Sequence, residues 1–168
     1  MRFRLARHSL GAAVQLYLLR HADADTVAPT DDERFLSEKG MMQAQRVARF
    51  CEAHALRPEL VLTSPLRRAH QTASMFVEKV DVEMRTVLWL SSGAAPETIV
   101  KELRELRNLA SVMLVGHEPD FSQLAAHLIG APEPENIRIR KASILVFTIR
   151  EFAAGGARLE YSLPPKLL

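Results

Sequence analysis

The stretch that decides the fold is Val14-Gln15-Leu16-Tyr17-Leu18-Leu19-Arg20-His21, in which a short apolar run ends abruptly at an arginine and a histidine. A continuous apolar run rich in β-formers predicts a buried strand over residues 14–19. The strand delivers Arg20 and His21 to a loop at its carboxyl end. Ligands of open α/β sheets bind outside the carboxyl ends of the strands, so these two residues are the first candidates for a functional site.

The same pattern of strand, polar turn and helix recurs twice further along the chain. At its first recurrence, Leu60 to Thr63 is a short apolar run that predicts a second strand. Ser64-Pro65 follows as the expected N-cap and first-turn proline of a helix. This interpretation places Arg68 in the first turn of that helix.

A third expected strand ends at a histidine. Ser111 to Val115 is apolar, Gly116-His117-Glu118 is typical of a turn, and Pro119 opens a helix that stops at Gly130. The carboxyl ends of neighbouring parallel strands lie at one edge of a sheet. We therefore expect the polar residues that follow the three strands to converge.

The rest of the chain completes an alternation of strands and helices. Helices are expected over residues 37–56, 64–80, 96–109 and 119–130, with Ser37 as an N-cap, and further strands over residues 87–90, 144–149 and 159–163. This pattern predicts one three-layer α/β domain over residues 14–168. Its sheet is expected to be mostly parallel, with helices on both faces and antiparallel strands at the C-terminal edge.

The composition limits the cellular location and the binding partners that we expect for the protein. Residues 1–13 are expected to be a disordered tail, because their scattered apolar positions form no signal-peptide core. The chain has a single cysteine and no run near the roughly 18 apolar residues of a membrane span. Its formal charge of +2 is spread along the chain without interleaved aromatic residues. These features predict a cytoplasmic protein that binds neither membranes nor nucleic acid.

The candidate residues suit a phosphoryl group. This compact dianion is held best by guanidinium groups, imidazoles and helix N-termini, which also stabilise the charge of its transition state. Arg20 and Arg68 supply guanidinium groups, and His117 could donate a hydrogen bond to a phosphoryl oxygen. The neutral imidazole of His21 could attack phosphorus and form a phosphohistidine intermediate.

Four segments carry a family pattern: Leu19-Arg20-His21-Ala22, Arg34-Phe35-Leu36-Ser37-Glu38-Lys39-Gly40 with Gln43-Ala44, Ser64-Pro65-Leu66-Arg67-Arg68-Ala69-His70-Gln71-Thr72, and Val115-Gly116-His117. In order and spacing they resemble the histidine phosphatase superfamily. The resemblance implies a phosphoglycerate mutase-like fold, with His21 as nucleophile and Arg20, Arg68 and His117 as phosphoryl-binding residues. It implies no metal and no cofactor. The short chain most resembles SixA-type phosphohistidine phosphatases within that superfamily.

The resemblance implies a metal-independent phosphatase that removes phosphate from phosphohistidine in proteins through a phosphohistidine enzyme intermediate. Two alternatives stay open, namely a small-molecule phosphomonoesterase of the same superfamily and a catalytically silent phosphate-binding module. Many relatives supply a glutamate as general acid, whereas residues 89–95 contain no carboxylate. Glu97, Glu118 and Asp23 are the substitute candidates. A phosphohistidine substrate relieves the need for an acid, because a protonated imidazole leaves easily.

Other motifs receive structural interpretations. Cys51-Glu52-Ala53-His54-Ala55-Leu56-Arg57 matches the C-x5-R pattern of cysteine phosphatases, but Cys51 falls on the apolar face of an expected helix. No glycine opens a phosphate-binding loop there either, so we expect core packing. Lys141 and the acidic run Asp31-Asp32-Glu33 are expected to be solvated. His54, His70 and His127 are expected to be structural.

Overall fold

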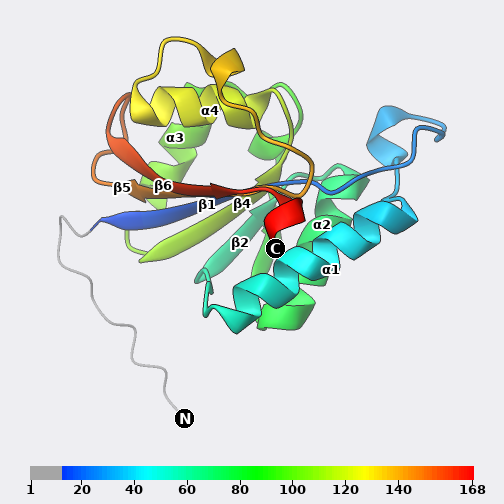
Figure 1. Ribbon diagram of the computed structural model, residues 1–168. Helices are drawn as coiled ribbons and strands as arrows, with labels where there is room; N and C mark the ends of the chain where they lie inside the picture. The colour runs from blue at the N-terminus through cyan, green and yellow to red at the C-terminus, as the bar shows by residue number, and fades with distance from the viewer. Residues whose placement is uncertain (1–12) are drawn as a thin grey trace.

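Two layers of helices cover a central sheet (Figure 1). One face carries α1 (Glu38–Ala53) and α2 (Arg67–Val80), and the other carries α3 (Pro96–Glu105) and α4 (Asp120–Ile129). The computed structural model describes residues 13–168, so residues 1–12 of the expected tail lie outside the described part. No helix within residues 13–168 is long and apolar enough to cross a membrane. The predicted three-layer α/β architecture is confirmed.

The sheet has six strands in the order β3-β2-β4-β1-β5-β6. Their bounds are Val14–Arg20 (β1), Leu60–Thr63 (β2), Met84–Thr86 (β3), Ser111–Gly116 (β4), Ile144–Ile149 (β5) and Ala157–Leu163 (β6). The four strands from β3 to β1 pair in parallel. By contrast, β5 pairs antiparallel with β1, and β6 pairs antiparallel with β5. This arrangement confirms the predicted mostly parallel sheet with antiparallel strands at its C-terminal edge.

The side chains of β1 alternate between two separate cores. Leu16 and Leu18 pack in the cluster that includes residues of α3 and α4, whereas Tyr17 and Leu19 pack in the cluster that includes residues of α1 and α2. A strand buried on both faces has no polar side to show in the sequence. This burial explains why β1 reads as a continuous apolar run.

The predicted outer strand at residues 87–90 is wrong. The edge strand is Met84–Thr86, which pairs in parallel with β2, whereas Leu88–Leu90 forms a 3₁₀ turn in which Leu88 is 80% exposed. Only one face of a short edge strand needs to be covered, so its sequence need not be apolar. The prediction placed the strand at the apolar run that follows β3.

Helix boundaries also differ from the prediction. Ser37 caps α1 as expected, because its hydroxyl accepts a hydrogen bond from the N–H of Gly40. Ser64 does not cap α2: the helix begins at Arg67, and the Ser64 hydroxyl instead accepts from the N–H of Leu66, at 3.2 Å, in the preceding turn. The third helix ends at Glu105 rather than near residue 109. Helix ends commonly differ by a turn from sequence expectation, since the last turn tightens to satisfy its own carbonyls.

The three strand ends that carry the candidate residues lie side by side. Leu19 of β1 and Thr63 of β2 both pair with Val115 of the intervening β4. The backbone continues this pairing beyond the strands, since the N–H of His21 bonds to the oxygen of Gly116 at 2.9 Å. The sheet therefore fixes His21, Ser64 and His117 at one edge, as the strand pattern predicted.

Candidate active site

Four residues predicted for the site are brought together at this edge. His21, Arg68 and His117 are buried and Arg20 is half-buried. The ring centroids of His21 and His117 are 5.2 Å apart, with the ring planes at 51°. The charges of Arg68 and Arg20 both lower the pKa of each histidine, which places the two guanidinium groups close to both rings.

The imidazole of His21 is held with one nitrogen free. Its Nδ1 lies 2.7 Å from the carbonyl oxygen of Ala22, an oxygen that can only accept, so Nδ1 carries the proton. The Nε2 atom is then unprotonated and has its lone pair available. The N–H of Ala22 bonds to the hydroxyl of Thr72, whose own proton goes to the carbonyl of Arg68. The first turns of α2 thus anchor the loop that orients the ring.

Burial keeps the His21 ring neutral. Desolvation lowers its pKa to about 3, and the charges of His117, Arg68 and Arg20 act in the same direction, against an opposing contribution from the hydrogen bond to Ala22. A charged imidazolium could not attack an electrophile, whereas a neutral ring can. His21 therefore has the protonation state that a nucleophile needs at neutral pH.

Arg68 meets an acidic residue that sequence reasoning left solvated. One terminal nitrogen donates to the backbone oxygen of Asp31 at 2.7 Å, and the other donates to the Asp31 carboxylate at 2.9 Å. Arg34 pairs with the same carboxylate at 3.0 Å. Asp31 is exposed, as expected for a solvated loop, but its carboxylate is also paired with two arginines. Asp31 and Arg68 are far apart in sequence, so no spacing rule signals their contact.

His117 has one ring nitrogen bonded to the protein and one without a partner among the described residues. Its Nε2 lies 2.7 Å from the hydroxyl oxygen of Ser64, and that oxygen already accepts from the N–H of Leu66. The Ser64 hydroxyl can also donate, and with its proton assigned to Nε2 the ring proton of His117 lies on Nδ1. This buried Nδ1 has no hydrogen-bond partner among the described residues. His117 thus carries a buried and unpaired donor next to His21.

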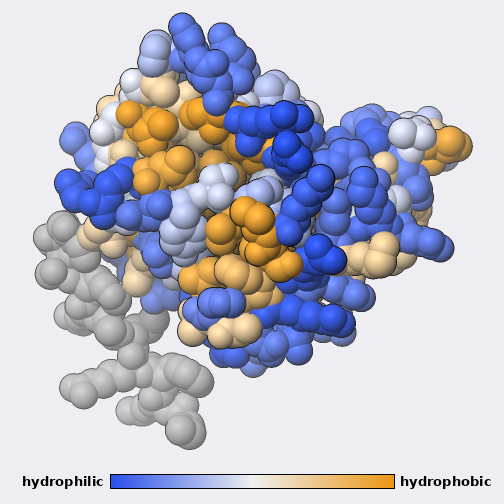
Figure 2. All heavy atoms as spheres, viewed as in Figure 1, coloured by the Kyte–Doolittle hydropathy of each residue, from blue (hydrophilic) through white to orange (hydrophobic). Residues whose placement is uncertain are grey.

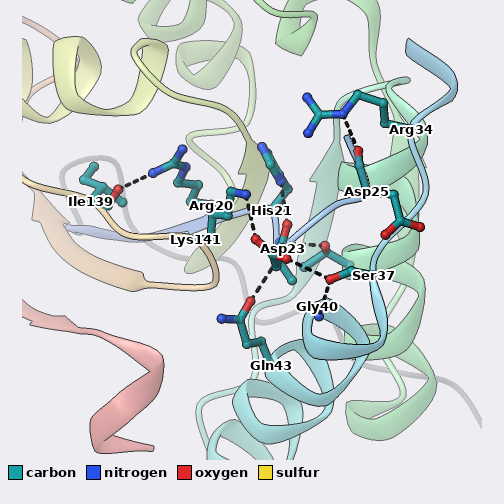
Figure 3. A network of polar contacts seen from close by, with 12 residues as sticks. Arg20, His21, Asp23, Asp25, Arg34, Ser37, Gly40, Gln43, Ile139 and Lys141 are labelled. Atoms are coloured by element: carbon teal, nitrogen blue, oxygen red, sulfur yellow. Dashed lines mark hydrogen bonds and ion pairs between the residues drawn. The ribbon is translucent and has the colours of Figure 1, made fainter. Parts of the chain in front are cut away.

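Arg20 occupies the boundary between the histidines and a large cavity. One terminal nitrogen donates to the carbonyl oxygen of Ile139 at 2.6 Å, while its buried Nε has no partner among the described residues. Figure 3 shows Arg20 and His21 with the neighbouring polar network. Arg20 also lines a cavity of about 720 Å³, together with Glu118. Arg20 thus has one guanidinium nitrogen bonded to the protein and a buried Nε that remains unpaired within residues 13–168.

The three carboxylates considered as general acids have different surroundings. Glu118 directly follows His117, and burial raises its pKa, which favours a carboxyl that keeps its proton. Asp23 pairs with Lys141 at 2.7 Å, and this hydrogen bond lowers its pKa, so Asp23 is held in the charged form.

Glu97 is held away from the histidines. Its carboxylate lies 3.6 Å from His127, in the last turn of α4, whereas His117 precedes the first turn of that helix. A helix of this length separates the two by roughly 15 Å. Glu118 is thus the one of the three that combines proximity with a protonation tendency suited to an acid.

The rival cysteine mechanism has no structural support. Cys51 lies on the inner face of α1 with no exposed surface, and burial raises the pKa of its thiol to about 12. A thiol with such a pKa is not a thiolate at neutral pH. Within residues 13–168, no three His, Cys, Asp or Glu side chains are grouped so that they could hold a metal ion.

Two arginines and two histidines gathered beyond the ends of parallel strands suit the binding and transfer of a phosphoryl group. Residues 16–90 match the family model of the histidine phosphatase superfamily (branch 1). The phosphohistidine phosphatase SixA of Escherichia coli is 29% identical over 133 residues, which cover 72% of this chain and 78% of the relative.

Solved structures share the whole fold. The protein histidine phosphatase SixA complexed with tungstate superposes with a TM-score of 0.84 at 24% identity, over 91% of this chain and 98% of that one. A mycobacterial glucosyl-3-phosphoglycerate phosphatase gives 0.73 at 20% identity, over 88% and 97%. The chain belongs to the histidine phosphatase superfamily and is a phosphatase similar to SixA.

Proposed function

We propose that this protein is a metal-independent phosphatase that removes phosphate from phosphohistidine in proteins, through a phosphohistidine intermediate on His21. The observation that carries the proposal is the neutral His21 ring, whose Nδ1 is bonded to a carbonyl and whose Nε2 is free. The surrounding cations and the unpaired donor of His117 suit the three phosphoryl oxygens.

The first chemical step is the attack of His21 Nε2 on phosphorus. The Nε2–P bond forms while the bond from phosphorus to the substrate nitrogen breaks, and the electron pair of that bond leaves with the substrate imidazole. Arg20, Arg68 and His117 Nδ1 stabilise the charge on the phosphoryl oxygens. The Ala22 carbonyl stabilises the positive charge that His21 acquires, through the hydrogen bond from Nδ1.

The second step is hydrolysis of the phosphoenzyme. A water oxygen attacks phosphorus, the Nε2–P bond breaks, and His21 regains its lone pair while the water proton passes to solvent. Neither step requires a strong acid when the leaving group is an imidazole. The similarity to SixA supports the choice of a protein substrate, because SixA is named as a phosphohistidine phosphatase.

The second candidate is a small-molecule phosphomonoesterase. Two observations favour it: the raised pKa of Glu118 would suit protonation of an alkoxide, and the cavity beside Arg20 is of the size that small ligands occupy. A solved neighbour of the same fold is a glucosyl-3-phosphoglycerate phosphatase. The third candidate, a silent phosphate-binding module, is incompatible with turnover of any substrate.

The test compares a histidine-phosphorylated protein, an aryl phosphate and an alkyl phosphosugar under identical conditions, with and without a metal chelator. We expect phosphate release from the first two to exceed release from the sugar phosphate, with no effect of the chelator. His21→Asn should abolish release and any acid-labile phosphoenzyme while leaving the unfolding transition cooperative. Preferred hydrolysis of the sugar phosphate, or an active His21→Asn variant, would overturn the proposal.

A further inference from the structure

A cavity of about 720 Å³ opens beside Arg20, and Asp31 is not among the residues that line it. Its walls come from the start of α1, from the segment that leads into β5, and from the C-terminal 3₁₀ turn η4 (Pro165–Leu167). Figure 3 shows Arg20, Lys141, Asp23 and Gln43, which are four of its lining residues. Cavities of this volume are in the usual range for ligand sites.

The cavity is strongly basic. Six cationic side chains line it, namely Arg20, Lys39, Arg138, Arg140, Lys141 and Lys166, against the three carboxylates of Asp23, Glu118 and Glu135. One of these carboxylates is already neutralised, because Asp23 pairs with Lys141. Figure 2 shows strongly hydrophilic side chains on this face, in the region where Figure 1 places the segment leading into β5. The net positive charge is therefore concentrated, although the whole chain carries only +2.

Most of these cations lack a partner in the protein. Lys39, Arg138, Arg140 and Lys166 are exposed and form no ion pair with any carboxylate that the structure describes. Like charges that face one cavity repel one another, so their arrangement is unfavourable unless an anion joins them. A cleft lined by charges of one sign also attracts ligands of opposite charge.

The cavity adjoins the candidate phosphoryl site at two residues, Arg20 and Glu118. Arg20 lines it and also lowers the pKa of His21 and His117 by its charge, and Glu118 lines it directly after His117 in the chain. The other flank of the site is occupied by Asp31, which is bonded to Arg68. A substrate whose phosphoryl group reaches His21 beside Arg20 can therefore extend its remaining atoms into the basic cavity.

We propose that this basic cavity binds a second anionic group of the substrate, a carboxylate or a phosphate separate from the phosphoryl group that is transferred. Resting on the proposed function, the inference identifies the substrate as a phosphoprotein with acidic side chains near its phosphohistidine. Arginine forks at Arg138 and Arg140 suit planar carboxylates and phosphates alike. A small molecule with two phosphates would use the same chemistry.

The test uses two pairs of substrates, each matched in its leaving group. One pair consists of phosphohistidine peptides with glutamates or with glutamines beside the phosphohistidine. The other pair consists of an aryl phosphate with or without a second phosphate on the ring. The measured quantity is the ratio of kcat/KM for the acidic member to kcat/KM for the neutral member of each pair.

Two double variants remove cations from opposite walls, Arg138→Gln with Arg140→Gln and Lys39→Gln with Lys166→Gln. We expect the wild-type ratio to exceed one in at least one pair, to fall about tenfold in each variant, and to decline with added salt. Arg49→Gln with Lys101→Gln is the matched control, since both residues are exposed and neither lines the cavity. The control should leave the ratio unchanged.

The outcomes separate this proposal from the proposed function. If neither phosphohistidine peptide is hydrolysed but the aryl pair shows the charge effect, the proposed phosphohistidine phosphatase activity is wrong. The anion subsite is then supported, with a small molecule as the substrate that supplies the second anionic group. If both peptides are hydrolysed equally and the aryl pair also shows a ratio of one, the subsite is overturned while the function stands. A ratio that the control changes as much as the cavity variants would also overturn the subsite.

Discussion

Both terminal nitrogens of Arg68 are bonded to Asp31, one to its backbone oxygen at 2.7 Å and one to its carboxylate at 2.9 Å. Asp31 thus occupies two hydrogen-bond donors that a phosphoryl group could use, and its carboxylate occupies one of them. Arg68 is buried, whereas the side chain of Asp31 is 60% exposed, so the acidic partner is the one that can move away. The contact makes Asp31 a competitor for the anion-binding arginine.

Removing the charge of Asp31 should therefore tighten anion binding. We expect Asp31→Asn to lower the inhibition constant of inorganic phosphate by about fivefold, which corresponds to roughly 1 kcal/mol for a nearby charge at a solvated site. Inhibition of aryl phosphate hydrolysis measures this constant. Asp32→Asn is the control, because the neighbouring carboxylate has no resolved contact with Arg68. Weaker phosphate binding by Asp31→Asn would show that Asp31 orients Arg68 rather than competing for it.

The adjacent pair Arg67 and Arg68 allows a matched test of the phosphate-binding role. Arg68→Ala should lower kcat/KM by about 100-fold or more, because it removes a buried charge that stabilises the transition state. Arg67 instead lies over the ring of Phe35, 4.4 Å from its centroid. Arg67→Ala should therefore change kcat/KM by less than about threefold. Equal losses in both variants would contradict the assignment of Arg68.

The strand ends could be predicted from the sequence, because a strand buried on both faces consists mainly of apolar residues. Residues 16–19 of β1, 60–62 of β2 and 112–115 of β4 are apolar, and polar residues follow each of these runs at or near the strand end. Arg20, His21 and His117 could be located from that transition alone. By contrast, β3 is a short edge strand with exposed polar positions, so no apolar run marks it in the sequence.

The contacts that sequence reasoning missed all depend on loop conformation. The pairing of Asp31 with Arg68 joins residues 37 positions apart, and the contact of Ser64 with His117 joins residues 53 apart. Ser64 had a convincing local interpretation as a helix cap, which the backbone then did not adopt. Local preference assigns such a residue one hydrogen bond, but tertiary structure decides which partner it takes.

Substitution of the buried Cys51 should change the stability of the protein but not its activity. Cys51→Ser should retain kcat/KM within about twofold, since the residue lies in the core beneath α1, but should lower the free energy of unfolding by about 1–3 kcal/mol through burial of a hydroxyl. Cys51→Ala introduces no polar atom and should cost less. Chemical denaturation and aryl phosphate hydrolysis provide the two readouts. A folded but inactive Cys51→Ser variant would revive a cysteine mechanism.

The neutral state of His21 makes stability depend on pH. In the unfolded chain His21 gains a proton below its ordinary pKa of 6.5, whereas the folded protein resists protonation until about pH 3. The stabilisation linked to His21 is thus complete above pH 6.5 and is lost as the pH falls toward 3. Between pH 6.5 and about pH 4.5 this loss amounts to about 2–3 kcal/mol.

Comparison with His21→Asn isolates that contribution, because His117 and the carboxylates titrate in both proteins. The variant should lose about 2–3 kcal/mol less than the wild type between neutral pH and about pH 4.5, as measured by denaturant unfolding at each pH. Identical losses would mean that His21 is protonated in the folded protein over this range. At those acidic pH values the proton would then occupy the lone pair of Nε2.

The role of Glu118 depends on the leaving group. An alkoxide departs slowly without a proton, whereas an imidazole or an aryl oxide departs readily, so an acid beside the site matters chiefly for alkyl esters. Burial raises the pKa of Glu118, and this residue follows His117 directly, while Glu97 is tied to His127 at the far end of α4.

Glu118→Gln should therefore lower kcat/KM for an alkyl phosphate by at least about tenfold and for phosphohistidine by less than about threefold. Glu97→Gln should change neither rate, and steady-state kinetics on both substrates measures all four values. An equal loss on both substrates in Glu118→Gln would identify a binding role for the carboxyl, since only proton donation distinguishes the two leaving groups.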